Sequence, residues 1–170
     1  PETSIGWYRK KFSLNALDSN KRFNIQFDGI FRNAQIWING FYLGNNQSGY
    51  IGVTYDITDM VWFDRPNTVV VRVDATQYEG WFYEGAGIYR HVWLNKTNPL
   101  HVPADGIFVS TTKLNENNAE LTSKVSVINE GSKLQHFKII QTIYDSAGKS
   151  IANATIANLN LKPMETKEFE

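Results

Sequence analysis

Two carboxylates lie five residues apart in the segment EGWFYE, at Glu79 and Glu84. Two carboxyl groups held about 5 Å apart can hydrolyse a glycosidic bond, one as acid and one as nucleophile. Glutamates on a surface loop are usually solvated or paired with an arginine, and spacing along a chain does not fix their separation in space. The residue types therefore permit a catalytic pair, but they favour the structural alternative.

Three aromatic residues stand between these carboxylates: Trp81, Phe82 and Tyr83. Sugars present apolar C–H faces that stack on indole and phenol rings, while their hydroxyl groups bind polar side chains. The segment from Glu79 to Glu84 offers both parts of such a site. The alternative is that the rings fill the space between two sheets, because aromatic residues are more often buried than bound to a ligand. Glycines on both sides of the segment favour an outward-facing loop, since they relax the backbone there.

Other site chemistries find little support in the residues. The chain has no cysteine, which excludes disulfides and thiolate metal sites. The three histidines, His91, His101 and His136, lack the close spacing of metal-binding motifs. GAGIYR resembles the start of the dinucleotide motif GxGxxG, but Arg90 replaces the third glycine and the required helix does not follow. We therefore expect no metal and no cofactor in this chain.

Charge and hydropathy narrow the class of partner. Lysine plus arginine and aspartate plus glutamate both number 17, so the formal net charge is zero. A nucleic acid or an anionic membrane demands clustered positive charge, and neither is expected as a partner. No apolar run approaches the roughly 18 residues of a membrane helix, and the N-terminus lacks the apolar core of a signal peptide.

Alternation with a period of two dominates the first hundred residues and predicts an all-β fold. In KRFNIQFDGI, Phe23, Ile25 and Phe27 point to one face, as in a half-buried strand. Asn39-Gly40 divides two apolar segments and predicts a hairpin, because both turn residues need positive φ. NTVVVRVDA, residues 67–75, predicts a central strand covered on both faces. GIYRHVWL, residues 87–94, alternates again.

The character of the sequence changes after Leu94. NKTNPLHVPADG holds two prolines that cannot donate to a central ladder, so it predicts a linker with a domain boundary near Asn98. Beyond it, short alternating strands around glycine-containing turns predict an immunoglobulin-like sandwich. Such a sandwich takes roughly 100 residues, so residues 99–170 are expected to lack its last strands.

Four blocks, in the same order, closely resemble the N-terminal domain of the glycoside hydrolase family 2 enzymes. They are GWYRKKF, FDGIFRNAQIWINGFYLGNNQSGYIGVTYDIT, NTVVVRVDA and EGWFYEGAGIYRHVWL. The resemblance is nearest to bacterial β-galactosidases. It implies that residues 1–98 are a galactose-binding-like jelly roll, incomplete at its N-terminus, and that residues 99–170 are an immunoglobulin-like sandwich, incomplete at its C-terminus.

The resemblance also implies a division of labour. Family members use two glutamates of a (β/α)₈ barrel, which is expected beyond Glu170, so no residue of this chain is expected to be catalytic. The loop before GAGIYR is expected to complete the sugar pocket over that barrel, which makes its residues the candidates for binding substrate: Glu79, Trp81, Phe82, Tyr83 and Glu84. The expected partners are a β-linked sugar and the barrel itself, and an oligomer is compatible with the sequence.

The same resemblance leaves alternatives open. A β-glucuronidase or a β-mannosidase is the nearest rival to a β-galactosidase, and a free-standing carbohydrate-binding module or a structural β-sandwich scaffold is the rival from other classes. Many relatives carry Arg-Trp-Tyr or an acidic residue where this chain has Trp81-Phe82-Tyr83. A polar sugar contact or a bound sodium ion therefore cannot be transferred to Trp81. The compartment stays open, with a periplasmic or secreted location slightly preferred.

Overall fold

The computed structural model describes residues 4–77, 86–116 and 118–170. They divide into two compact units between Asn98 and Pro99. The strands of the first unit are β1 (Ile5–Phe12), β2 (Arg22–Phe27), β3 (Ile30–Phe31), β4 (Ala34–Ile38), β5 (Phe41–Asn46), β6 (Val53–Asp56), β7 (Asn67–Asp74), β8 (Gly87–Ile88) and β9 (Val92–Thr97), with 3₁₀ turns at Ala16–Asp18 and Thr58–Met60.

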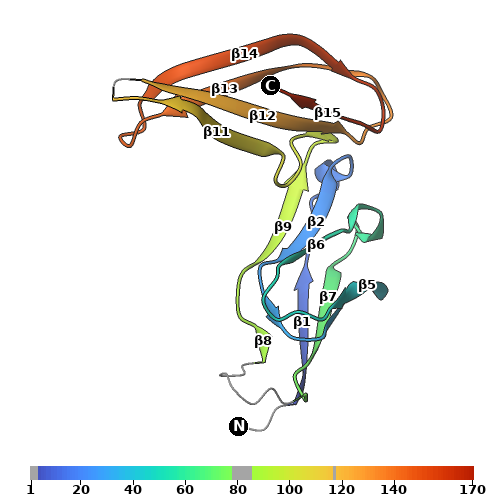
Figure 1. The fold of residues 1–170 in the computed structure, drawn as a ribbon. Coiled ribbons are helices and arrows are strands. Elements are labelled where there is room, and N and C mark those ends of the chain that lie inside the picture. Colours follow the sequence, from blue (N-terminus) through green and yellow to red (C-terminus); the bar gives the residue numbers. More distant parts are fainter. Residues whose placement is uncertain (1–3, 78–85, 117) are drawn as a thin grey trace. The chain divides into compact units, whose positions relative to one another are not determined.

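The first unit is a sandwich of two antiparallel sheets (Figure 1). One sheet has the order β1-β7-β4-β5 and the other β6-β2-β9, while β3 and β8 pair at one end. Phe23, Ile25 and Phe27 of β2 face alternate side chains of β4 and β7 across the core, and all three are buried as the alternation predicts. The predicted strand at residues 67–75 is central in its sheet, between β1 and β4. Its outer face is only half-buried, because that face carries the charged Arg72 and Asp74.

The predicted Asn-Gly hairpin is confirmed between β4 and β5. Asn39 and Gly40 have φ angles of 52° and 89°, as a two-residue turn of this kind requires. Asn39 also binds beyond its own turn, since its side-chain Nδ2 donates to Oδ1 of the fully buried Asn67 at 2.8 Å. Asn67 in turn accepts from the backbone N–H of Trp62 and donates to the same residue's carbonyl. The buried amide of Asn67 and the partly buried amide of Asn39 thus tie the hairpin to the loop before β7.

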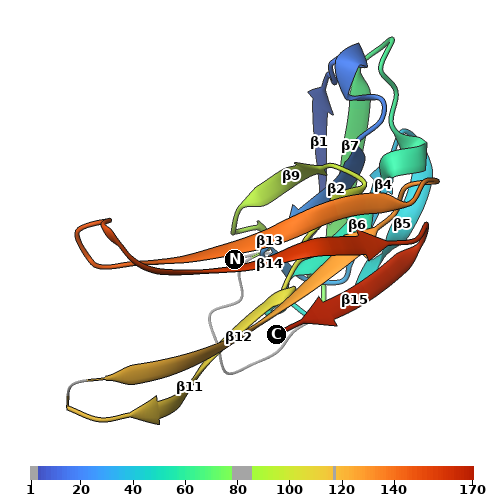
Figure 2. The same cartoon turned by 90° about the horizontal axis from the view of Figure 1, so that it is seen from above.

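The second unit contains β10 (Leu100–His101), β11 (Ile107–Leu114), β12 (Ala119–Asn129), β13 (Gln135–Tyr144), β14 (Ser150–Leu161) and β15 (Glu165–Phe169). Both β10 and β11 pair with β12, which also pairs with β15, and β13 and β14 form a separate two-stranded ribbon, visible as the long orange and red pair in Figure 2. The core between them is small and contains Val125, Val127, Leu161 and Phe169.

The prediction of an all-β protein built of sandwiches is confirmed. The strands of the second unit are longer than the short ones expected, because β12, β13 and β14 continue as paired ribbons past the core residues. No helix among the described residues is long and apolar enough to span a membrane.

Candidate functional site

The residues predicted to bind substrate, Glu79, Trp81, Phe82, Tyr83 and Glu84, lie outside the described residues. The described chain stops at Gln77 and resumes at Ala86, immediately before β8. The described part of the candidate site consists of the residues on either side of that segment.

The chain leaves β7 through a hydrogen-bonded turn at Asp74. Its Oδ1 accepts from the hydroxyl of Thr76 at 2.7 Å and from the backbone N–H of Thr76 at 3.2 Å, while Oδ2 accepts from Arg72 at 2.8 Å. These donors, the Thr76 hydroxyl foremost, lower the pKa of Asp74 below its ordinary value. The carboxylate is thereby held ionised, and it fixes the direction in which the chain departs from the sheet.

Arg32 is the buried cation beside this exit. Only 6% of the residue is exposed, and its guanidinium donates to the carbonyl oxygen of Gln77. The guanidinium carbon also lies 5.5 Å from the ring centroid of Phe31, within the range of a cation–π contact. The backbone of Arg32 accepts from Asp74 N–H at 3.1 Å, which ties it to the end of β7. A fixed positive charge therefore stands where the predicted sugar-binding segment begins.

The return of the chain is fixed by glycines under tyrosine rings. Gly87 has a φ of 122°, and a Cβ at this position would stand 2.2 Å from the hydroxyl of Tyr8. Tyr89 covers Gly29, where a Cβ would meet the ring at 2.6 Å, and the Tyr89 hydroxyl donates to the carbonyl of Gly49 at 2.7 Å. Both ends of the segment are consequently anchored to the rest of the sandwich by specific contacts.

Aromatic rings gather on the loop beside this return. Tyr50 is 71% exposed and meets Phe31 edge-on, with ring centroids 5.7 Å apart. Sequence reasoning missed Arg32, Phe31 and Tyr50, although an arginine between two apolar strands in IFRNAQIWI was a visible signal. The exposed ring of Tyr50, packed on the buried ring of Phe31 next to a buried cation and hydrogen-bonding backbone, provides the two components of a sugar site, an apolar face and polar groups.

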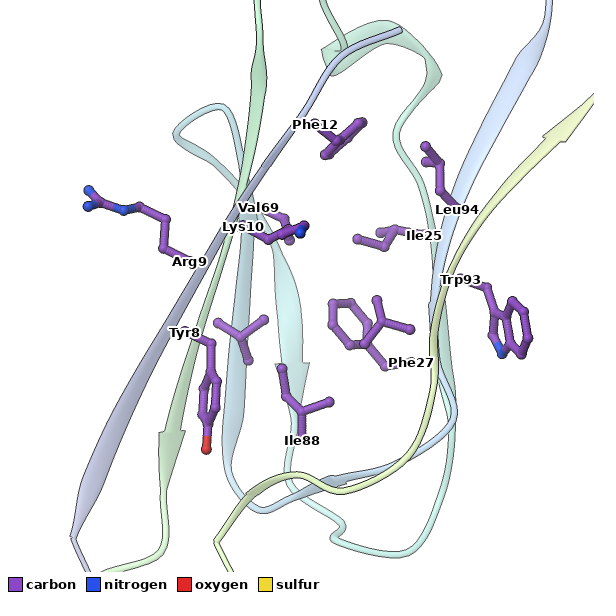
Figure 3. A pocket seen from close by; sticks show the side chains of 12 residues that line it. Tyr8, Arg9, Lys10, Phe12, Ile25, Phe27, Val69, Ile88, Trp93 and Leu94 are labelled. Atoms are coloured by element: carbon purple, nitrogen blue, oxygen red, sulfur yellow. The ribbon is translucent and has the colours of Figure 1, made fainter.

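A separate groove of about 460 Å³ opens on the flank of the sandwich between β1 and β9 (Figure 3). Tyr8, Lys10 and Phe12 line one side, and apolar residues of β2, β7 and β9 line the rest. Figure 3 shows Arg9 and Trp93 pointing away from it. Such a lining offers few partners for sugar hydroxyls, so the groove is an open edge of the core and a poor sugar pocket. Among the described residues no group of three metal-ligating side chains comes together.

Comparison with known proteins decides the family. The profile of the glycosyl hydrolases family 2 sugar binding domain matches residues 1–99, more than half of the chain. The chain belongs to glycosyl hydrolase family 2. Over 149 residues it is 40% identical to the β-galactosidase BoGH2A of Bacteroides ovatus, covering 87% of this chain and 18% of that protein.

The chain is also similar to proteins that are named β-glucuronidases and to solved structures of the family. A β-glucuronidase of Formosa agariphila is 28% identical over 169 residues, covering 87% of this chain and 17% of its own. A solved family 2 enzyme of Bacteroides cellulosilyticus superposes with a TM-score of 0.90 at 34% identity, over 98% of this chain and 23% of that one. A family 2 β-glucuronidase structure superposes with a TM-score of 0.93 at 26% identity, over 98% and 20%. The chain thus spans about a fifth of the length of these relatives.

Proposed function

We propose that this chain is the non-catalytic N-terminal part of a retaining β-glycosidase, whose first domain completes the sugar pocket and braces the catalytic barrel. The observation that carries the proposal is that the described residues on both sides of positions 78–85 are held in place, by Arg32 and Asp74 before them and by the contacts of Gly87 and Tyr89 after them. Flanking residues that are already ordered lower the entropic cost of binding a ligand between them. Residues 1–98 are the jelly-roll domain and residues 99–170 the immunoglobulin-like domain.

The substrate proposed is a β-galactoside. The relative that is 40% identical over 149 residues is named a β-galactosidase, which supports this choice. The two glutamates at Glu79 and Glu84 support it as well, because their two negative charges outnumber the single positive charge of Arg32 and so disfavour the carboxylate of a glucuronide. The second candidate is a β-glucuronide, which the names of several relatives and solved structures favour.

A chimera tests both parts of the proposal. The corresponding region of the Bacteroides ovatus β-galactosidase is replaced by this chain, and kcat/KM is measured on p-nitrophenyl β-galactoside and β-glucuronide. We expect turnover of the galactoside by the chimera and none by this chain alone, because the acid and the nucleophile belong to the barrel. If the chimera is as inactive as the Bacteroides ovatus enzyme from which this region is deleted, the proposal that the region braces the catalytic barrel is contradicted. Submillimolar binding of galactose by this chain alone that is lost in Trp81→Ala would favour a free-standing module.

Trp81→Ala in the active chimera separates the pocket role from the core role. If Trp81 binds sugar, kcat/KM falls while the melting temperature is unchanged, because binding energy is realised in the transition state. If it fills the core, unfolding becomes easier by about 3–5 kcal/mol with normal kcat/KM. Trp7→Ala is the matched control, since Trp7 is 63% exposed on the outer face of β1 and should alter neither quantity.

A further inference from the structure

The outer face of the sheet β6-β2-β9 carries a group of side chains that the proposed function does not use. Because Phe23, Ile25 and Phe27 of β2 face the core, Asn24 and Gln26 between them face outward. The register places Trp93 of β9 opposite Gln26 and Asn95 opposite Asn24, on that same outer face. Trp93 is 48% exposed, although a tryptophan is among the side chains that gain most from burial.

A continuous chain of hydrogen bonds runs across this face and ends on the indole. Asn95 Nδ2 donates to Gln26 Oε1 at 3.1 Å, and Gln26 Nε2 donates to Asp28 Oδ1 at 2.9 Å. The other carboxylate oxygen, Asp28 Oδ2, accepts from Trp93 Nε1 at 2.8 Å. The exposed indole is therefore held in one orientation by its polar edge, so that it loses little freedom when a ligand stacks on it.

A second ring extends the platform. The imidazole of His91 stacks on Trp93 with centroids 5.2 Å apart and planes 29° apart, and its side chain is 78% exposed. His91 Nδ1 lies 4.0 Å from Asp28 Oδ2, close enough for the carboxylate to attract a protonated ring. Two rings and a line of polar groups thus lie side by side on one exposed surface.

The chemistry of this surface selects one class of ligand. A phosphate-bearing ligand such as nucleic acid would meet the carboxylate of Asp28, and the net charge of the chain gives no attraction to offset that repulsion. A wholly apolar partner would strip water from Asp28, Gln26 and Asn95 without replacing their hydrogen bonds, which is costly. A neutral sugar ring satisfies both requirements, because its C–H face covers an aromatic ring while its hydroxyls donate to carboxylate and amide oxygens and accept from the imidazole.

We propose that Trp93, His91, Asp28, Gln26 and Asn95 form a second carbohydrate-binding platform, for a neutral hexopyranose, separate from the segment at residues 78–85. It lies on the outer face of a sheet and holds no general acid paired with a nucleophile, so it binds sugar without cleaving it. Its role is to hold a polysaccharide or oligosaccharide near the enzyme.

The test uses this chain labelled with 5-fluorotryptophan. The five tryptophans give five fluorine signals, assigned by replacing each with phenylalanine, and the labelled chain is titrated with galactobiose, with cellobiose and with glucuronate. We expect the Trp93 signal to move saturably with a neutral disaccharide and to stay fixed with glucuronate. The signals of Trp7 and Trp37, which stack on each other on the other sheet, serve as internal controls.

Three substitutions sharpen the titration. Asp28→Ala frees the indole and should weaken binding at least tenfold, while the unchanged signals of the other tryptophans show that the fold is retained. His91→Ala removes one of two rings and should weaken binding about threefold to tenfold. Trp7→Ala should leave affinity unchanged.

Four outcomes would overturn the platform. The first three are a Trp93 signal that does not move, a signal that moves equally with glucuronate, and binding that Asp28→Ala leaves undiminished. The fourth is a Trp93 signal that moves when the chain is diluted without sugar, because this would indicate a contact between copies of the chain. Movement of the Trp81 signal alone would support the proposed pocket and reject the platform, so the two proposals fail separately.

Discussion

The two units of the chain use β-strands with very different success in enclosing apolar side chains. Among the described residues, twelve apolar side chains form the buried core of the first unit, from four of its strands and from the residues that flank the 3₁₀ turn at Thr58–Met60. Only four of the described apolar residues are buried in the second unit, although its strands β12, β13 and β14 are the longest of the described strands. Strand length alone therefore does not produce a buried core. A buried core forms where two broad sheets face each other along their whole length.

The reason lies in the ribbon β13-β14. A two-stranded sheet covers little area, and Ile140, Ile143, Tyr144 and Ile151 remain exposed on it. Between this ribbon and the β11-β12 pair a groove of about 710 Å³ stays open, lined by Ile107, Val109 and Ile139 among others. The second unit is thus stabilised more by ladder hydrogen bonds and less by burial than the first.

The largest expected difference concerns phenylalanines in the two cores. Phe23→Ala in the first unit should cost about 3–5 kcal/mol of unfolding free energy, because Phe23 is fully buried. Phe137→Ala should cost less than about 3 kcal/mol, because Phe137 is only partly buried beside Phe169. Urea unfolding of both variants measures the contrast, with the exposed Leu17→Ala as a neutral control. Equal losses would show that the second core is as complete as the first.

A smaller and more even effect is expected for the buried asparagines. Asn67→Ala strands the groups of Trp62 and Asn39, and Asn129→Ala strands the carbonyls of Lys133 and Leu161 that Asn129 Nδ2 meets at 2.9 and 3.1 Å. Each stranded buried group costs about 1–3 kcal/mol, so both variants should lose stability by similar amounts. Calorimetry of the two variants measures both losses of stability. A loss of stability in only one variant would mean that water replaces the asparagine amide in the other unit.

In the first unit, the free energy of unfolding should depend on acid pH through Asp56. Burial raises the pKa of Asp56, but hydrogen bonds from Thr58 and from Arg22 at 2.6 Å outweigh it and the net pKa is lowered. A depressed folded pKa stabilises above the unfolded value of about 3.9, and that contribution is lost as pH falls through the folded pKa. Asp56→Asn should therefore be less stable at neutral pH and should lose less stability between neutral pH and pH 3. A parallel acid response in both proteins would contradict the assignment.

The smallest effect is expected in alkali, in the second unit. The hydrogen bond that Lys124 donates to the carboxylate of Glu168 raises the pKa of Lys124, with the charges of Glu168 and Glu170 adding to it. A raised folded pKa stabilises fully below the ordinary lysine value and is lost as pH rises through the folded pKa. Lys124→Met should remove the part of the alkaline loss that begins above about pH 10.4, the unperturbed lysine value. Thermal melts of both proteins from pH 8 to 11 give the comparison, and Lys113→Met is the matched surface control.

The sequence predicts the first unit better than the second because its signals are local. Alternation places Phe23, Ile25 and Phe27 correctly, and Asn39-Gly40 fixes a turn by backbone conformation alone. No local pattern announces that Asn67 and Asn129 are buried, because their partners come from other parts of the chain. The buried position of Arg32 is not predicted for the same reason, since its hydrogen-bond partner Gln77 lies 45 positions away in the sequence. The five residues predicted to bind sugar remain a prediction.

The pairing of β1 with β7 has a consequence for synthesis on the ribosome. Phe12 pairs with Asn67, and β1 pairs with no other strand among those described. During synthesis β1 is therefore unpaired until about 55 further residues have been made. At roughly 5–20 residues per second this takes about 3–11 s, during which Trp7, Tyr8 and Phe12 stand on an open edge. The consecutive cations Arg9, Lys10 and Lys11 in the middle of β1 repel the same strand of a neighbouring nascent chain. They protect an aromatic strand from aggregation until its partner emerges.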